Sequence, residues 1–87
     1  MNELVIEYLR KIEGLKDGVK AYAYNQEKWL EVAISDYDFY RDDASLHSIE
    51  NEFRNDLFQK YNTKVIFVYR EYNDAAFKLL KNKEIIK

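Results

Sequence analysis

The sequence predicts a small α+β domain in which a three-stranded mixed sheet packs against helices. Three observations support this fold class: an amphipathic stretch at the start, two alternating stretches after it, and a long amphipathic stretch that leads into a third, more apolar strand. The expected order is α-β-β-α-β-α. At 87 residues the chain has the length of a single domain, which we expect to cover residues 1–87.

The first helix is expected from about Glu3 to Glu13. Its apolar residues fall on one face at helical spacing, and they are Leu4, Val5, Tyr8, Leu9 and Ile12. Gly14 follows this face, and a glycine at that position typically ends a helix in the left-handed conformation.

Two strands follow, at residues 19–25 and 28–35. In the first, small side chains share one face, while Tyr22 and Tyr24 share the other. In the second, Trp29 and Glu31 alternate with a fully apolar face. Because only a short polar link joins the two strands, we expect an antiparallel hairpin.

The second long helix is expected over residues 44–61, with Phe53 in the middle of its apolar stripe and Asn62 as its left-handed terminator. The third strand is expected over residues 64–70, and a last helix from about Asn73. A right-handed crossover makes the strands at 28–35 and 64–70 parallel. The third strand can pair with either strand of the hairpin, so the strand order stays open.

The stretch Ser35–Asp43, "SDYDFYRDD", concentrates acids between the second strand and the long helix. The pair Asp36 and Asp38 resembles the metal-binding acids of nucleotidyltransferases, but the Gly-Ser phosphate loop of that family is missing upstream. Asp42 or Asp43 can instead cap the first N–H groups of the long helix. We therefore interpret the stretch as an acidic lead-in to that helix.

Catalytic, metal and cofactor sites are not expected. The chain has no cysteine, and its one histidine, His47, has neither a second histidine nor a cysteine to share a metal. The serines beside His47 are its neighbours along one helix, and such neighbours do not face each other. The prediction is a protein that is not an enzyme, with no cofactor and no metal.

Aromatic side chains on the sheet form the candidate interaction surface. Its residues are Tyr22, Tyr24, Trp29, Phe67 and Tyr69. Tyrosine and tryptophan are enriched in protein interfaces, so the predicted function is a non-catalytic protein-binding or regulatory module. An alternative is a nucleic-acid-binding domain that stacks bases on this face, but the face offers mainly Lys20 to hold phosphates. Nucleic acid is therefore not the expected partner.

Charge is distributed unevenly along the chain. Residues 31–56 carry eight acids and two arginines, whereas the whole chain has a formal charge of −2. This acidic middle allows a further alternative, an acidic decoy that occupies a nucleic-acid-binding protein. No stretch is long and apolar enough for a membrane span, and the start of the chain does not have the pattern of a signal peptide. The expected location is cytoplasmic, with no membrane partner.

The third strand is apolar on both faces, yet it is expected at an edge of the sheet. Only its flanks, Lys64 and Arg70, carry charge, and no proline blunts it. Such an edge can pair with another strand. We expect either shielding by the last helix, a homodimer through this strand, or a partner that adds a strand to it.

Overall fold

The computed structural model describes residues 1–71, and their structure confirms the predicted α+β class with a three-stranded mixed sheet. The elements are α1 (Asn2–Glu13), β1 (Ala21–Asn25), β2 (Leu30–Ile34), α2 (Tyr37–Asp42), α3 (Ala44–Tyr61) and β3 (Val65–Tyr69). The helix expected from about Asn73 lies outside the described residues.

The sheet has the order β1-β2-β3, which settles the strand order that the sequence left open. The hairpin of β1 and β2 is antiparallel, as predicted, and Ala23 lies opposite Val32. The strand β3 runs parallel to β2, with Phe67 opposite Val32. The apolar strand β3 is therefore an edge strand, as the sequence predicts.

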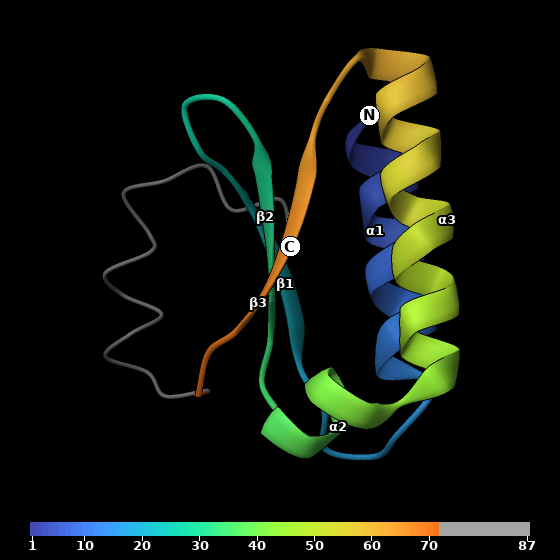
Figure 1. Ribbon diagram of the computed structural model, residues 1–87, viewed down its shortest axis with the longest axis vertical. Helices are drawn as coiled ribbons and strands as arrows, with labels where there is room; N and C mark the ends of the chain where they lie inside the picture. Colours follow the sequence, from blue (N-terminus) through green and yellow to red (C-terminus); the bar gives the residue numbers. More distant parts are fainter. Residues whose placement is uncertain (72–87) are drawn as a thin grey trace.

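Helices α1 and α3 lie next to each other on one face of the sheet (Figure 1). The small side chains of Ala21 and Ala23 are fully buried on this face, and α1 packs on β1 there. Tyr8 of α1 donates a hydrogen bond to the carboxylate of Asp56 on α3. Burial, and then that carboxylate, raise the pKa of the Tyr8 hydroxyl, so the hydroxyl stays protonated and keeps donating.

The core lies between this helical layer and the sheet. Phe53 is 0% exposed, and its ring centroid lies 4.7 Å from that of Tyr8 and 5.8 Å from that of Phe67. The position of Phe53 in the middle of the helical stripe predicted this. Aromatic rings in tilted and edge-on contact stabilise a core beyond the effect of burial alone.

The acidic stretch between β2 and α3 forms an additional short helix, α2, where the sequence predicted only a lead-in. The carboxylate of Asp36 accepts a hydrogen bond of 3.0 Å from the Phe39 N–H at the start of α2. Asp43 does the same for Leu46 N–H at 2.8 Å, and so caps α3. The predicted capping role is therefore confirmed for Asp43, because the side chains of this stretch satisfy the N–H groups that start each helix.

The ends of the helices follow the sequence only in part. Asn62 ends α3 in the left-handed conformation, with φ 52° and ψ 35°, as predicted. Gly14 does not: it stays in the right-handed region after α1, and Gly18 takes the positive φ, 83°, before β1. The prediction for Gly14 was wrong because three further residues of turn separate α1 from the point where the chain reverses.

Candidate functional site

The structure does not bring the five predicted surface aromatics onto one face. Phe67 lies opposite Val32 and is only 5% exposed, on the face that α1 and α3 cover. Tyr69 belongs to the same face, is 39% exposed, and contacts the ring of Tyr37 edge-on. Tyr22 and Tyr24 point to the opposite face. The sequence could not show this because an apolar strand with no alternation does not reveal which side faces the helices.

On that opposite face, Tyr24 is buried and forms part of a polar cluster. Arg70 donates a hydrogen bond of 2.9 Å from its Nε to the Tyr24 hydroxyl, and its Nη2 lies 3.6 Å from Glu31. The three residues come from β1, β2 and the end of β3, so the cluster ties the strands together. Trp29 lies half-buried in the turn before β2. These aromatics do not form the open stacking face that base recognition requires.

Among the described residues, no strand pairs with the outer edge of β3. Leu30 N–H donates to the carbonyl of Lys64 at 2.8 Å, and Arg70 N–H donates to the carbonyl of Ile34 at 3.0 Å. In a parallel pair, alternate residues turn both backbone groups toward the same neighbour. The N–H and C=O groups of Val65, Phe67 and Tyr69 therefore point away from β2, toward the free edge.

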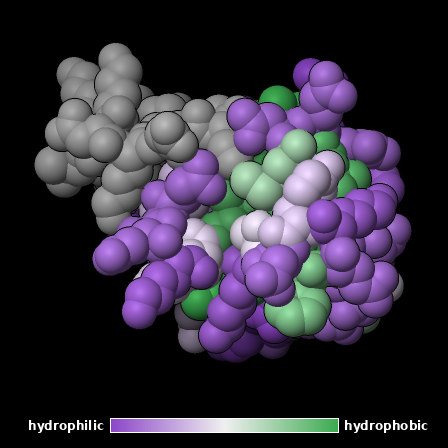
Figure 2. All heavy atoms as spheres, turned by 90° about the horizontal axis from the view of Figure 1, so that it is seen from above, coloured by the Kyte–Doolittle hydropathy of each residue, from purple (hydrophilic) through white to green (hydrophobic). Residues whose placement is uncertain are grey.

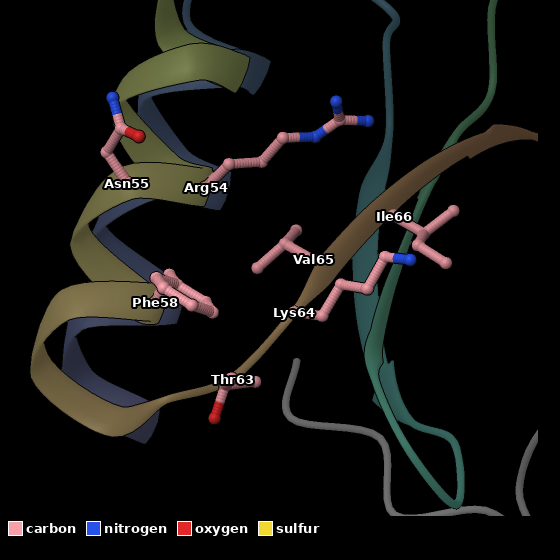
Figure 3. A pocket seen from close by; sticks show the side chains of 7 residues that line it. All are labelled: Arg54, Asn55, Phe58, Thr63, Lys64, Val65 and Ile66. Atoms are coloured by element: carbon pink, nitrogen blue, oxygen red, sulfur yellow. The ribbon is translucent and has the colours of Figure 1, made fainter.

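A hollow of about 410 Å³ opens beside this edge, between α3 and the start of β3 (Figure 3). Its lining residues are Arg54, Asn55, Phe58, Thr63, Lys64, Val65 and Ile66. Phe58 is 61% exposed, the largest exposed fraction among the large hydrophobic residues of the described chain. In Figure 3 the Phe58 ring and the Val65 side chain project toward the space between helix and strand, and Arg54 reaches across from α3 toward β3.

A second hollow of about 280 Å³ continues along β3 toward α2. It is lined by Tyr40, Arg41, His47, Glu50, Arg54 and Phe67. Arg54 borders both hollows, so they are neighbours along β3, and we call the two together the α3–β3 groove. The groove runs parallel to the free backbone groups of β3 and offers apolar surface at one end.

The charged groups of the groove are mostly cationic. Arg54 Nη2 lies 3.2 Å from Glu50, and the Glu50 carboxylate lies 3.8 Å from His47. Arg41 is held by Asp42, with its Nη2 2.7 Å from one carboxylate oxygen. Lys64 makes no ion pair with any residue between positions 1 and 71. As far as residues 1–71 are concerned, Lys64 is therefore a cation outside any ion pair at the rim, beside the outer edge of β3.

Apolar surface also lies at the end of the molecule where α1 begins and α3 ends. Met1, Phe58 and Tyr61 are all exposed there. Figure 2 views this end and shows apolar side chains among hydrophilic ones. The apolar part of the groove is therefore next to further exposed aromatic surface on the last turns of α3.

The acidic stretch is occupied by interactions within the chain. Asp36 pairs with Lys16 at 2.8 Å as well as capping α2. The hydrogen bond from Lys16, and then that from the Phe39 N–H, hold the pKa of Asp36 below its ordinary value. In residues 1–71 no three His, Cys, Asp or Glu side chains are grouped so that they could hold a metal ion.

The groove and its residues Arg54, Phe58 and Lys64 were not predicted from the sequence. One signal was present: Phe58 stands beside the apolar stripe of α3, where the helix turns toward solvent. An aromatic residue at such a position marks an exposed patch, but only the position of β3 next to α3 turns that patch into a groove.

Comparison with known proteins gives no relative: no family model, no curated protein and no solved structure matches the chain. None of the helices described here is long and apolar enough to cross a membrane. The geometry of the β3 edge and of the groove beside it is therefore the basis for a proposal of function.

Proposed function

We propose that the chain is a small non-catalytic protein-binding module that holds an extended segment of a partner along the free edge of β3. The observation that carries this proposal is the row of outward backbone groups on Val65, Phe67 and Tyr69 directly beside the α3–β3 groove. A strand added to such an edge gains affinity from main-chain hydrogen bonds and specificity from pockets for alternate side chains.

The edge has few of the features that natural proteins use to prevent pairing. Strand β3 contains no proline and no charged residue between Lys64 and Arg70. The hydroxyl of Tyr40 lies 3.5 Å from the carbonyl oxygen of Phe67, and among residues 1–71 this long contact is the one side-chain hydrogen bond to the outward groups of β3. Within residues 1–71, no other hydrogen bond reaches the outward groups of Val65, Phe67 and Tyr69.

Two other functions have less support. Base stacking on the sheet requires exposed aromatics, but Tyr24 and Phe67 are buried. Action as an acidic decoy requires free carboxylates, but Asp36, Asp42 and Asp43 are engaged with Lys16, Arg41 and a helix start.

The test uses a matched pair of substitutions at Tyr69. Tyr69→Pro removes an outward N–H and puts a ring at the edge, without removing a bond to β2. Tyr69→Ala removes the same side chain but keeps that N–H. A linear peptide library displayed on phage is selected on the immobilised wild-type chain, and the selected peptides are measured against both variants by fluorescence anisotropy.

We expect the selected peptides to bind the wild type and Tyr69→Ala, and to lose binding to Tyr69→Pro. Bound peptide should also slow hydrogen exchange at the amides of Val65, Phe67 and Tyr69, because their N–H groups become hydrogen-bonded. Peptides that bind Tyr69→Pro as well as they bind Tyr69→Ala would place recognition elsewhere on the surface.

A further inference from the structure

The cations of the α3–β3 groove indicate the chemistry of the segment that it takes. We infer that the partner is an acidic extended segment of another protein, in which a large apolar side chain and a carboxylate two residues apart face the groove. This inference rests on the proposed function, since it requires a strand on the β3 edge. It adds the sequence pattern of the ligand and excludes a second copy of the chain.

The spacing follows from the geometry of a strand. Alternate side chains of an added strand face the same side, so residues two apart both point toward α3. A side chain opposite Val65 reaches the apolar hollow that Phe58 borders. The next one on that side, opposite Phe67, reaches the part of the groove that Arg54 borders.

Arg54 can donate hydrogen bonds to a carboxylate of the partner. A guanidinium has five N–H donors, and the described contact with Glu50 involves only its Nη2. The residues that share this end of the groove are Tyr40, Arg41, His47, Glu50 and Phe67. Glu50 is the acid of this set, and it already lies beside both Arg54 and His47. Because Asp42 holds Arg41, Arg54 with its remaining N–H donors is the group of this set that a partner carboxylate can pair with.

Lys64 adds a second contact, on the other side of the strand. The side chain of Lys64 belongs to the even-numbered face of β3, opposite to Val65 and Phe67. In Figure 3 it extends from the strand away from Phe58. A partner residue next to the groove-facing ones in sequence turns toward this side. A carboxylate there pairs with a lysine that has no other ion pair in the described part of the chain.

A second copy of this chain fits the edge poorly. Antiparallel pairing of two full β3 strands about a twofold axis centres on Phe67. It then places Lys64 of each copy opposite Arg70 of the other, and like charges directly opposite destabilise a sheet. Neither edge strand, Ala21–Asn25 or Val65–Tyr69, contains an acid. A foreign acidic segment supplies the carboxylates that these two edge strands lack.

The test measures the peptides selected on the wild-type chain against charge variants. Arg54→Gln and Lys64→Gln each remove one cation from an exposed side chain, and Lys60→Gln is the control because Lys60 lies on α3 and does not line the groove. We expect each groove variant to weaken binding about threefold, and the control to change it by less than about 1.5-fold. Raising the salt concentration should weaken peptide binding to the wild type. It should weaken binding less in a variant that combines Arg54→Gln with Lys64→Gln.

A charge swap gives the sharper result. Combining Arg54→Glu with Lys64→Glu should weaken the acidic peptides by roughly tenfold or more, and peptides with lysine in place of their acids should recover the loss. The inference requires both results, the weaker binding of the acidic peptides and the recovered binding of the lysine peptides.

Other outcomes separate this inference from the proposed function. Peptides sensitive to Tyr69→Pro but indifferent to the charge variants would overturn the acidic pattern and leave strand addition standing. Peptides insensitive to Tyr69→Pro would overturn both. A wild-type dimer in sedimentation equilibrium would make a second copy the occupant. Displacement of the peptide by a single-stranded RNA oligonucleotide would mean that the cations hold phosphates, and would likewise overturn the inference.

Discussion

The hydroxyl of Tyr40, on the short helix α2, lies 3.5 Å from the carbonyl oxygen of Phe67 in the middle of β3. This contact joins the acidic connection to the edge strand, at the point where an added strand has to pair. The length is at the limit of a hydrogen bond, so the contact is weak. Tyr40 therefore covers the edge at one carbonyl without closing it.

Removing the Tyr40 hydroxyl should strengthen peptide binding at the edge. Tyr40→Phe keeps the ring but frees the Phe67 carbonyl, so a partner N–H no longer competes with the hydroxyl. We expect a gain of about twofold, since a net hydrogen bond contributes roughly 0.5–1.5 kcal/mol and this one is long. Anisotropy titration of the selected peptides measures it, with Tyr61→Phe on the exposed end of α3 as control. Weaker binding to Tyr40→Phe would mean that the hydroxyl contacts the partner.

Phe53 should be among the most sensitive positions for stability. It is fully buried between α1 and β3, so Phe53→Ala leaves a cavity and should lower the free energy of unfolding by about 3–5 kcal/mol. Phe58→Ala on the same helix is the matched control, because Phe58 is mostly exposed, and it should cost less than about 1 kcal/mol. Urea denaturation followed by circular dichroism compares them. Similar losses for the two variants would contradict the packing described for α3.

The sequence predicts the elements well where side-chain spacing determines them. The stripe on α3 placed Phe53 correctly, and alternation placed the hairpin of β1 and β2. It failed for Phe67, because a strand with apolar residues at every position has no alternation to show which side faces the core. The groove depends on which strand lies next to β2, and that is a property of the packed chain. No single segment of the sequence encodes it.

The cap at Asp43 should contribute measurably to stability. Asp43→Ala removes the acceptor for the Leu46 N–H at the start of α3, and we expect a loss of about 1 kcal/mol in the free energy of unfolding. Asp43→Asn keeps a side-chain oxygen at the same place and should restore most of that loss. The midpoints of urea unfolding measure these losses, provided that the dependence of the unfolding free energy on urea is the same in all variants. Equal losses for alanine and asparagine would show that the charge of Asp43, and not its hydrogen bond, stabilises α3.

Stability should fall in acid in part through Asp36. The hydrogen bond from Lys16 and the Phe39 N–H lower the pKa of Asp36 in the folded chain. A lowered folded-state pKa stabilises the fold above the ordinary value of 3.8, and the contribution disappears as the pH falls through the lower folded-state value. Asp36→Asn should therefore flatten the decline of stability in the range just below pH 4, and Lys16→Met should flatten it in part. Thermal melts across this range test both. An unchanged pH profile in Asp36→Asn would assign the acid sensitivity to other carboxylates.

The charges at the ends of β3 should decide whether the chain pairs with itself. In the wild type, full pairing of two β3 strands places Lys64 opposite Arg70 at both ends, and this repulsion should keep the chain monomeric. Lys64→Glu converts both contacts into attractive pairs, while Arg70 keeps its contacts with Tyr24 and Glu31. We expect the dimer dissociation constant to fall by roughly tenfold, because each cross-strand pair changes by up to about 1 kcal/mol. Sedimentation equilibrium measures this, with Lys60→Glu as a control of equal charge.

The same Lys64→Glu variant should bind acidic peptides more weakly, so one substitution moves self-association and partner binding in opposite directions. If it changed neither, the edge of β3 would not be the binding surface. If Lys60→Glu dimerised equally, net charge would explain the effect without strand pairing.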